Sequence, residues 1–204
     1  MKQFIIFLGH CFACIYREPI NKLIKKIAQL FYTGWISKGL KKIGRNSQFS
    51  FNQILLGKEH IEIKDNVFIG KGCCITAFCV NNEGDSSKII ICDNVMLGHN
   101  NHISAINEVF IDSGTRTGKN VLITDHSHGN PSSDVQKNIP PNNRPLFSKG
   151  KVYIGKNVWI GENVCILPGV QIGNNVIIGA NSVVTHSFDD NSIIAGVPAA
   201  IIKK

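Results

Sequence analysis

The stretch IGKNVWIGENVCILPGVQIGNNVIIGANSVV, residues 154–184, carries an aliphatic side chain at every sixth position. A period of six fits neither the 3.6-residue turn of an α-helix nor the two-residue alternation of a free strand. Valine stands two residues before most of these aliphatic residues, so both side chains share one face of a short strand. The register comprises Ile154, Ile160, Ile166, Ile172, Ile178 and Val184.

Glycine and asparagine recur at fixed places in the same stretch. Glycine usually follows the aliphatic residue and asparagine stands three residues after it, and both tolerate the left-handed backbone of a sharp corner. Each six residues therefore predict a strand and a corner, and three sixes predict one turn of a triangular β-solenoid. The register recurs through most of residues 61–184, interrupted by a predicted polar loop at 80–88 and by residues 124–150. The second break predicts a long loop without regular structure. Loops of this length in a compact domain usually have a function.

The first 45 residues differ from the rest of the chain in charge. They hold nine lysines and arginines against Glu18 alone, which accounts for the whole net charge of +8. Apolar residues at helical spacing, such as Ile24 and Ile27, predict a basic helical extension. Two interpretations stay open: a helix packed on the main domain, which is favoured, and a helix on an anionic membrane surface. A nucleic-acid binder would usually spread its basic surface over the folded domain, so no nucleic-acid partner is predicted.

Other features of the sequence bear on its location. The apolar run Phe4–Tyr16 is too short to span a bilayer and lacks the pattern of a secretory signal. The odd number of cysteines and the missing signal predict a reducing cytoplasm. Cys73 and Cys79 are predicted to be small core residues.

Three motifs carry a resemblance to a known family. They are NVLITDHSHG (120–129), RPLFSKGKVYIGKNVWIG (144–161) and IGANSVVTHSFDDNSIIAGVPAAIIKK (178–204). With them, residues 61–204 resemble the hexapeptide-repeat acyltransferases, in the branch of sugar O-acetyltransferases that modify O-antigen, capsule and other surface glycans, with galactoside and maltose acetyltransferases as relatives. The resemblance implies an all-β, left-handed parallel β-helix, a homotrimer with active sites between neighbouring coils, and acyl-CoA lying along the solenoid. The expected division is a helical extension at 1–45 and a β-helix acyltransferase domain at 46–204, with the loop insertion 124–150.

The resemblance places the general base at His126, directly after a repeat strand. A sugar hydroxyl is a poor nucleophile until a base removes its proton, and imidazole titrates near the working pH. His128 is the main rival, and it would otherwise shape the loop or contact the acceptor. Asp125 either orients the imidazole or simply ends the strand at a corner.

The resemblance also indicates a donor site. Trp159 points outward and is predicted to line a ligand cleft or an interface. Gly179 and Ala180 are expected to leave space for the pantetheine arm, and a lysine at the C-terminus to meet the CoA phosphates. The chain departs from its relatives after the GVP sequence, where they often have a basic residue and this chain has Pro-Ala-Ala. The predicted contacts of the donor, acetyl-CoA, are Trp159, Gly161, Gly179, Ala180, Thr185 and Lys203, with Lys204 as an addition.

For the acceptor, Arg144 is predicted to contact an anionic sugar or to hold the loop. His99 and Asn101, with His102 nearby, are predicted to line the acceptor side of the cleft or to serve as corner residues.

These expectations define an acetyl-CoA-dependent O-acetyltransferase acting on a sugar or surface-glycan precursor, cytoplasmic or peripheral at the inner membrane, with no metal required. Two alternatives stay open on the same fold. One is a non-catalytic trimeric scaffold, since fold does not settle function. The other is a carbonic-anhydrase-like enzyme with zinc held by histidines, for which His99, His102, His126 and His128 are available.

Overall fold

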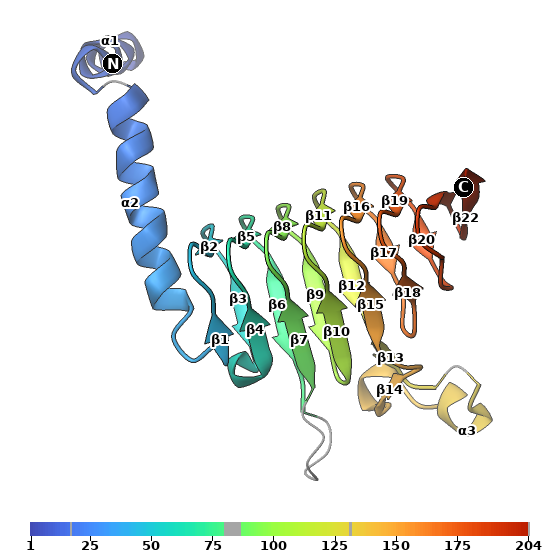
Figure 1. Cartoon of the computed structure of the whole chain (residues 1–204). Helices are drawn as coiled ribbons and strands as arrows, with labels where there is room; N and C mark the ends of the chain where they lie inside the picture. The colour runs from blue at the N-terminus through green and yellow to red at the C-terminus, as the bar shows by residue number, and fades with distance from the viewer. Residues whose placement is uncertain (17, 80–86, 131, 204) are drawn as a thin grey trace.

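The computed structural model describes residues 1–16, 18–79, 87–130 and 132–203. Two helices precede a triangular solenoid of stacked coils (Figure 1). Each full coil contributes one strand to each of three sheets, which we name A, B and C, and the coils pair in parallel. The predicted β-solenoid is therefore confirmed.

The strands of the three sheets are short. Sheet A comprises β1 (Lys42–Ile43), β4 (Ile61–Ile63), β7 (Lys88–Ile91), β10 (Glu108–Ile111), β15 (Val152–Ile154) and β18 (Gln171–Ile172). Sheet B comprises β2 (Gln48–Phe49), β5 (Phe68–Ile69), β8 (Met96–Leu97), β11 (Arg116–Thr117), β16 (Trp159–Ile160), β19 (Ile177–Ile178), β21 (Ile193–Gly196) and β22 (Ala199–Lys203). Sheet C comprises β3 (Ile54–Leu56), β6 (Cys74–Ala77), β9 (His102–Ala105), β12 (Leu122–Thr124), β17 (Cys165–Ile166) and β20 (Val183–Val184). Only β22 runs antiparallel to its neighbour within these three sheets, as far as the chain is described.

The six-residue register forms the core. Ile154, Ile160, Ile166 and Ile172 are fully buried, and the matching residues of the earlier coils line the same interior. Burying one such side chain contributes about 1.5–3 kcal/mol, so stacking the coils supplies most of the stability. Cys73 is buried as predicted. The prediction for Cys79 is wrong, because this residue lies beyond the end of β6, exposed, with its sulfur 3.0 Å from His60 Nε2.

The three corners of the triangle differ in one respect. We name them AB, BC and CA after the sheets that they join. Successive inward residues are six positions apart across corners AB and BC, as from Ile154 to Ile160. Across corner CA the separation ranges from four, between Val184 and Phe188, to thirty-one, between Ile123 and Ile154. All irregularity of coil length is therefore placed at corner CA.

Asparagines stack along the two regular corners. Asn120, Asn163 and Asn181 adopt φ values of 56°, 58° and 60°, in the left-handed region that asparagine tolerates. Asn120 Nδ2 donates to Asn163 Oδ1 at 3.1 Å, and Asn163 Nδ2 donates to Asn181 Oδ1 at 3.0 Å. The corner asparagines that the sequence indicated thus tie one coil to the next.

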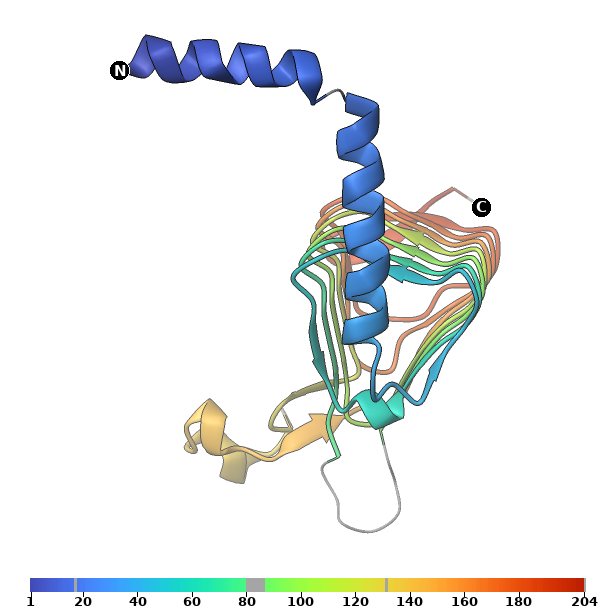
Figure 2. The same cartoon turned by 90° about the vertical axis from the view of Figure 1, so that its left-hand side faces the viewer.

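The N-terminal extension is helical as expected, with α1 (Lys2–Ile15) and α2 (Glu18–Ile36). The C-terminal half of α2 packs across the open end of the first coil (Figure 2). There Tyr32 Oη accepts from Gln53 N at 2.9 Å, and Thr33 Oγ1 accepts from Phe49 N at 3.0 Å. The first solenoid strand already begins at Lys42. The division at residue 45 into two domains stays a prediction. Among the described helices, none is long and apolar enough to cross a membrane.

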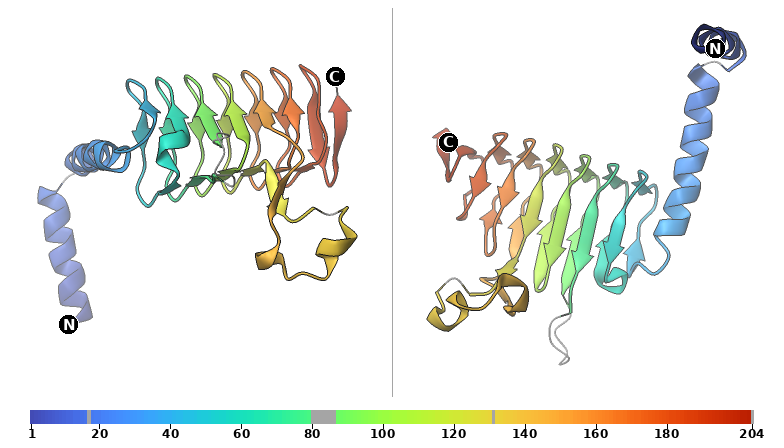
Figure 3. Two further views of the ribbon diagram at one scale, coloured as in Figure 1. Left: turned by 90° about the horizontal axis from the view of Figure 1, so that it is seen from below. Right: turned by 180° about the vertical axis from the view of Figure 1, so that it is seen from behind.

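The insertion at corner CA has more structure than the sequence suggested. Its ends form the antiparallel hairpin of β13 (His126–His128) and β14 (Leu146–Ser148), which projects from the solenoid (Figure 3). Between these strands lie the short helix α3 (Asp134–Lys137) and the 3₁₀ turn η2 (Pro141–Asn143); a second 3₁₀ turn, η1 (Lys58–His60), precedes β4. The prediction of a structureless loop over 124–150 is therefore wrong, because the two ends of the insertion pair with each other. Of the predicted polar loop 80–88, residues 80–86 lie outside the described residues.

A charged cluster on sheet A gives a testable pH dependence. Lys64 Nζ donates to Glu62 at 2.8 Å and Lys41 Nζ lies 2.9 Å away, and these two partners lower the pKa of Glu62 to about 2. A depressed carboxyl pKa adds stability above pH 4.5, which is lost as the pH falls toward 2. We expect Glu62→Gln to cost about 1–2 kcal/mol in unfolding free energy at pH 7, since water partly screens the pair. In urea unfolding, the difference in unfolding free energy between wild type and Glu62→Gln should become smaller below pH 4.5. A difference that does not change with pH would contradict the lowered pKa of Glu62. Glu59→Gln, at an exposed position, is the control.

Candidate active site

Asp125 and His126 form a buried pair at corner CA. Asp125 is completely buried, and its two carboxylate oxygens accept the backbone N–H groups of Ile106 at 2.9 Å and Asn107 at 2.7 Å. The Asp125 oxygen that accepts the hydrogen bond from Ile106 also lies 3.0 Å from His126 Nδ1. The side chain of His126 is 10% exposed. The carboxylate is therefore fixed by the neighbouring coil and in turn fixes the imidazole.

The pair decides which imidazole nitrogen is basic. A carboxylate only accepts hydrogen bonds, so the hydrogen of a neutral His126 ring belongs on Nδ1 and the lone pair on Nε2. Thr124 Oγ1, 3.3 Å from Nδ1, lies on the same side of the ring. Among the described residues, Nε2 has no hydrogen-bond partner. This nitrogen is thus free to take a proton from a bound molecule.

Two side chains complete the surroundings of His126. Phe78, just beyond β6, meets the imidazole edge-on with ring centroids 6.2 Å apart. His102 stands on the outer side of β9, and partial burial lowers its pKa. The nearby His126 lowers it further, because two imidazolium rings would repel each other.

A groove of about 990 Å³ runs along the outer face of sheet B. Its floor is made of outward side chains from five successive coils, from Phe68 on β5 to Ile177 on β19, and its border follows the glycines of corner BC. Arg116 pairs in register with Met96 on one side and Trp159 on the other. Trp159 is 57% exposed. Of the predicted donor contacts, the groove brings together Trp159, Gly161, Gly179 and Ala180.

The corner glycines have a different task from the one expected. A Cβ on Gly161 would stand 2.5 Å from the backbone N of Ala180, and one on Gly98 would stand 2.0 Å from the carbonyl oxygen of Gly118. The missing side chains therefore face the next coil and not a ligand. The expectation that Gly179 leaves space for pantetheine is corrected in the same way, since its Cβ would meet Ala195 at 2.8 Å.

Of the residues predicted for the acceptor side, only His102 lies near His126 among those described. His99 lines the groove on sheet B, where its Nδ1 accepts from Lys71 N at 2.8 Å, in agreement with the corner interpretation. Asn101 is buried; its amide donates to Thr117 and accepts from Val121 N at 2.8 Å. Since its amide is used between coils, the substrate role of Asn101 is withdrawn.

Arg144 and His128 lie on the insertion hairpin. Arg144 donates from Nε to the carbonyl of Ile139 at 2.7 Å and from Nη2 to that of Lys137 at 3.2 Å. Both carbonyl groups belong to the insertion itself, so contact of Arg144 with an anionic sugar and holding of the loop against its neighbour both stay predictions. His128 is exposed on β13, opposite Leu146.

The remaining donor candidates lie apart from the groove. Thr185 follows β20 at corner CA, with its hydroxyl 3.2 Å from His186 Nδ1. Lys203 is on β22, opposite Ile193, at the C-terminal end of sheet B. Lys204 lies outside the described residues. Within one chain, the predicted contacts of acetyl-CoA are thus divided between corner CA and sheet B.

Sequence reasoning missed two cations of the groove and one wall of the His126 site. Arg116 and Lys119 line the groove, and Phe78 contacts His126. The signal was available for Arg116, since it stands one position before the inward Thr117, as Trp159 does before Ile160. Neither Lys119 nor Phe78 follows from the repeat. Among the described residues, no group of three or more metal-binding side chains is assembled.

The groove and His126 lie on opposite sides of the triangular cross-section. Viewed along the solenoid, sheet B forms the side of the triangle that faces corner CA, from which the insertion projects (Figure 2). A ligand in the groove of one chain therefore does not meet the imidazole of the same chain across sheet B.

Comparisons with known proteins agree with this architecture. Residues 151–186 match the family described as bacterial transferase hexapeptide (six repeats). The chain is 45% identical over 147 residues to WbbJ of Escherichia coli (strain K12), which carries the provisional name lipopolysaccharide biosynthesis O-acetyl transferase. The alignment covers 71% of this chain and 71% of that protein.

Solved structures with the same fold confirm the predicted left-handed parallel β-helix. One is AntD, an N-acyltransferase from Bacillus cereus in complex with dTDP and 3-hydroxybutyryl-CoA. It has a TM-score of 0.66 and 23% identity, over 83% of this chain and 86% of that one. A maltose O-acetyltransferase from Clostridium difficile 630 has a TM-score of 0.54 and 24% identity, over 84% of this chain and 73% of that one.

Proposed function

The chain belongs to the hexapeptide-repeat acyltransferases, and from this premise we propose that it is an O-acetyltransferase that moves acetyl from acetyl-CoA to a hydroxyl of a sugar in a surface glycan. The observation that carries the proposal is the Asp125–His126 pair, which presents a free imidazole nitrogen at the mouth of a long insertion. The 45% identity to WbbJ supports hydroxyl rather than amine acylation and a glycan acceptor.

The chemistry needs one base and a bound thioester. His126 Nε2 takes the proton of the sugar hydroxyl while the hydroxyl oxygen attacks the thioester carbonyl carbon. The carbon–sulfur bond of the tetrahedral intermediate then breaks, the imidazolium returns its proton to the sulfur, and an acetyl ester and free CoA leave. Asp125 holds the imidazole in the required tautomer and stabilises its charged form. Phe78 limits the access of water to one side of the ring.

The groove on sheet B is the proposed donor site. Trp159 offers an aromatic wall for the pantetheine arm, and Arg116 and Lys119 offer positive charge for the CoA phosphates. Because corner CA lies across the triangle from this groove, we propose a homotrimer in which the His126 of one copy serves the groove of its neighbour. Lys203, at the end of the same sheet, is a further proposed phosphate contact.

We place the protein in the cytoplasm, with residues 1–45 in peripheral contact with the inner membrane. The exposed apolar side chains of α1 and the basic charge of the extension support this contact.

Calorimetric titration of CoA and acetyl-CoA into the full chain tests the proposed function first. Binding of both, followed by thiol release when sugars are added, is the expected result. If neither ligand binds, the acyltransferase proposal fails and the scaffold alternative takes its place.

The groove makes a separate prediction. We expect Trp159→Ala to weaken CoA binding about three- to tenfold, because an aromatic wall contributes about 0.5–1.5 kcal/mol beyond its buried area. Tyr153→Ala is the matched control, since this exposed aromatic lies on sheet A, stacked on Phe110. If the Trp159 variant binds CoA as tightly as wild type does, the donor site is not the groove on sheet B.

A further inference from the structure

Helix α1 is apolar over most of its circumference, with Gln3 and His10 on one side. Phe4, Ile5, Phe7 and Phe12 are each more than 60% exposed, and Ile6 and Leu8 are about half exposed. Five consecutive apolar residues, 4–8, spread over most of a helix that turns 100° per residue. A soluble protein rarely leaves so large a continuous apolar surface in water, so this helix requires a covering partner.

The free face of α2 continues this apolar surface. Ile24, Ile27 and Phe31 are exposed, and they line a groove of about 540 Å³ together with Trp35 and Phe51. The helix packs on the solenoid through Thr33 and Ile36, and Tyr32 lies at the edge between this packed side and the groove. The unpartnered surface therefore runs over both helices.

Basic side chains occupy the polar face of α2 and the start of α1. Lys22, Lys25 and Lys26 are exposed on α2, and Lys2 is exposed at the start of α1. Residues 1–45 carry nine basic side chains against one acidic one, while residues 46–204 carry thirteen of each sign. An amphipathic helix with an apolar face and lysines on its polar face complements an anionic bilayer surface, which offers acyl chains to the first and phosphate groups to the second. If the helices of a second copy covered this surface, the lysines of the two copies would lie close together and repel each other.

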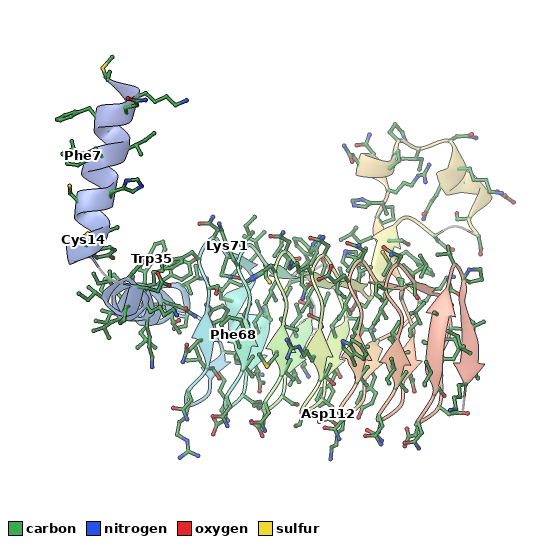
Figure 4. All side chains as sticks on the ribbon, turned by 90° about the horizontal axis from the view of Figure 1, so that it is seen from above. Phe7, Cys14, Trp35, Phe68, Lys71 and Asp112 are labelled. Atoms are coloured by element: carbon green, nitrogen blue, oxygen red, sulfur yellow. The ribbon has the colours of Figure 1, made fainter. Side chains whose placement is uncertain are left out.

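The length and placement of the helices favour lying in the surface over spanning it. The 14 residues of α1 extend about 21 Å, which is less than the roughly 30 Å of a hydrocarbon core. Both helices lie beyond the first coil, and their axes cross the long axis of the solenoid (Figures 1 and 4). One plane across the N-terminal end of the solenoid can therefore touch both.

We propose that α1 lies within one leaflet of an anionic bilayer, parallel to its plane, with the lysines of α2 on the lipid phosphates. The solenoid then stands on the membrane on its N-terminal end, with its C-terminal coil farthest from the lipid. This proposal deepens the membrane contact proposed above, and it does not depend on acetyl transfer. In a homotrimer of parallel solenoids, three such helix pairs would meet the same plane.

Vesicle flotation of the full chain tests the proposal. Vesicles of 30% phosphatidylglycerol in phosphatidylcholine should carry the wild type upward. We expect Phe7→Glu with Phe12→Glu to lower the vesicle-bound fraction at least tenfold, because both side chains would have to enter lipid. Val135→Glu, an equally drastic change at an 80% exposed apolar residue of the insertion, should float as wild type does.

The charge requirement has its own pair of variants. Lys25→Glu with Lys26→Glu should weaken flotation, and wild-type flotation should fall as salt screens the lysines. Lys156→Glu, on an exposed corner of the solenoid, is the control. Equal flotation on pure phosphatidylcholine would overturn the role given to anionic lipid.

Depth is measured with a single tryptophan at position 7. Phe7→Trp, with Trp35→Phe and Trp159→Phe, should be quenched by lipids brominated on the acyl chain. No quenching would overturn the placement of α1. If Phe7→Glu with Phe12→Glu instead reduces the oligomeric state in vesicle-free solution, a second copy covers α1 and the lipid proposal is wrong. His126→Ala should float as wild type does, which separates this test from the proposed catalysis.

Discussion

His126→Ala is expected to lower the turnover number for acetyl transfer about 10²- to 10⁴-fold, the range that a positioned general base contributes. Binding of acetyl-CoA should change little, because the proposed contacts of the donor are groove residues such as Trp159 and Arg116, while the imidazole acts on the acceptor hydroxyl. The variant should fold normally, since His126 contributes a partly exposed ring and no core packing. Thiol release gives the turnover number, and calorimetry gives the affinity.

His128→Ala is the matched control for this prediction. The side chain is on the same strand, two residues away, and exposed. Its loss should change turnover by less than about threefold. If the His128 variant loses activity and the His126 variant retains it, the assignment of the base is wrong, although the family assignment is untouched.

Asp125→Ala is expected to destabilise the fold by about 2–4 kcal/mol and to lower turnover to the level of the His126 variant. The carboxylate is fully buried and accepts the N–H groups of Ile106 and Asn107, and each unsatisfied buried donor costs about 1–3 kcal/mol. The imidazole would also lose the group that keeps its hydrogen on Nδ1. Urea unfolding and the turnover number measure the two effects separately.

Asp125→Asn separates the positioning role from the structural one. The amide oxygen can still accept a backbone N–H, so part of the lost stability should return. The amide NH₂ has to face a donor, however, so turnover should stay at least tenfold below wild type. Asp112→Ala controls for removal of an aspartate, because the Asp112 carboxylate accepts from Ser113 N and the Tyr153 hydroxyl and lies away from His126 on sheet A. Full activity in Asp125→Asn would show that the carboxylate does not select the tautomer.

The solenoid was predictable because its core obeys a rule that is local in sequence. Inward residues such as Ile154 and Ile160 recur every sixth position, and each corner needs a backbone that asparagine accepts. The pairing of Asp125 with His126 was also within reach, since the two residues are adjacent. The family resemblance supplied the role, and the structure supplies the hydrogen-bond geometry.

Other features depend on what the next coil places alongside. Gly179 was expected to leave space for the pantetheine arm, but a Cβ at this position would meet Ala195, sixteen positions later. Asn101 looked like a polar surface residue, but its amide bonds between coils to Thr117 and Val121. Cys79 seemed to continue the register, although β6 has already ended at Ala77. The neighbours of these side chains belong to the adjacent coil, so the sequence pattern of a single coil does not predict them.

The confinement of irregular length to corner CA bears on how such a protein can diverge. Corner CA accommodates separations from four to thirty-one residues with the strands in register, whereas corners AB and BC keep a separation of six throughout the described coils. Lineages can therefore exchange the segment beside His126 wholesale while the groove on sheet B is inherited unchanged. Acceptor preference can thus change rapidly among descendants that all keep the same acyl donor.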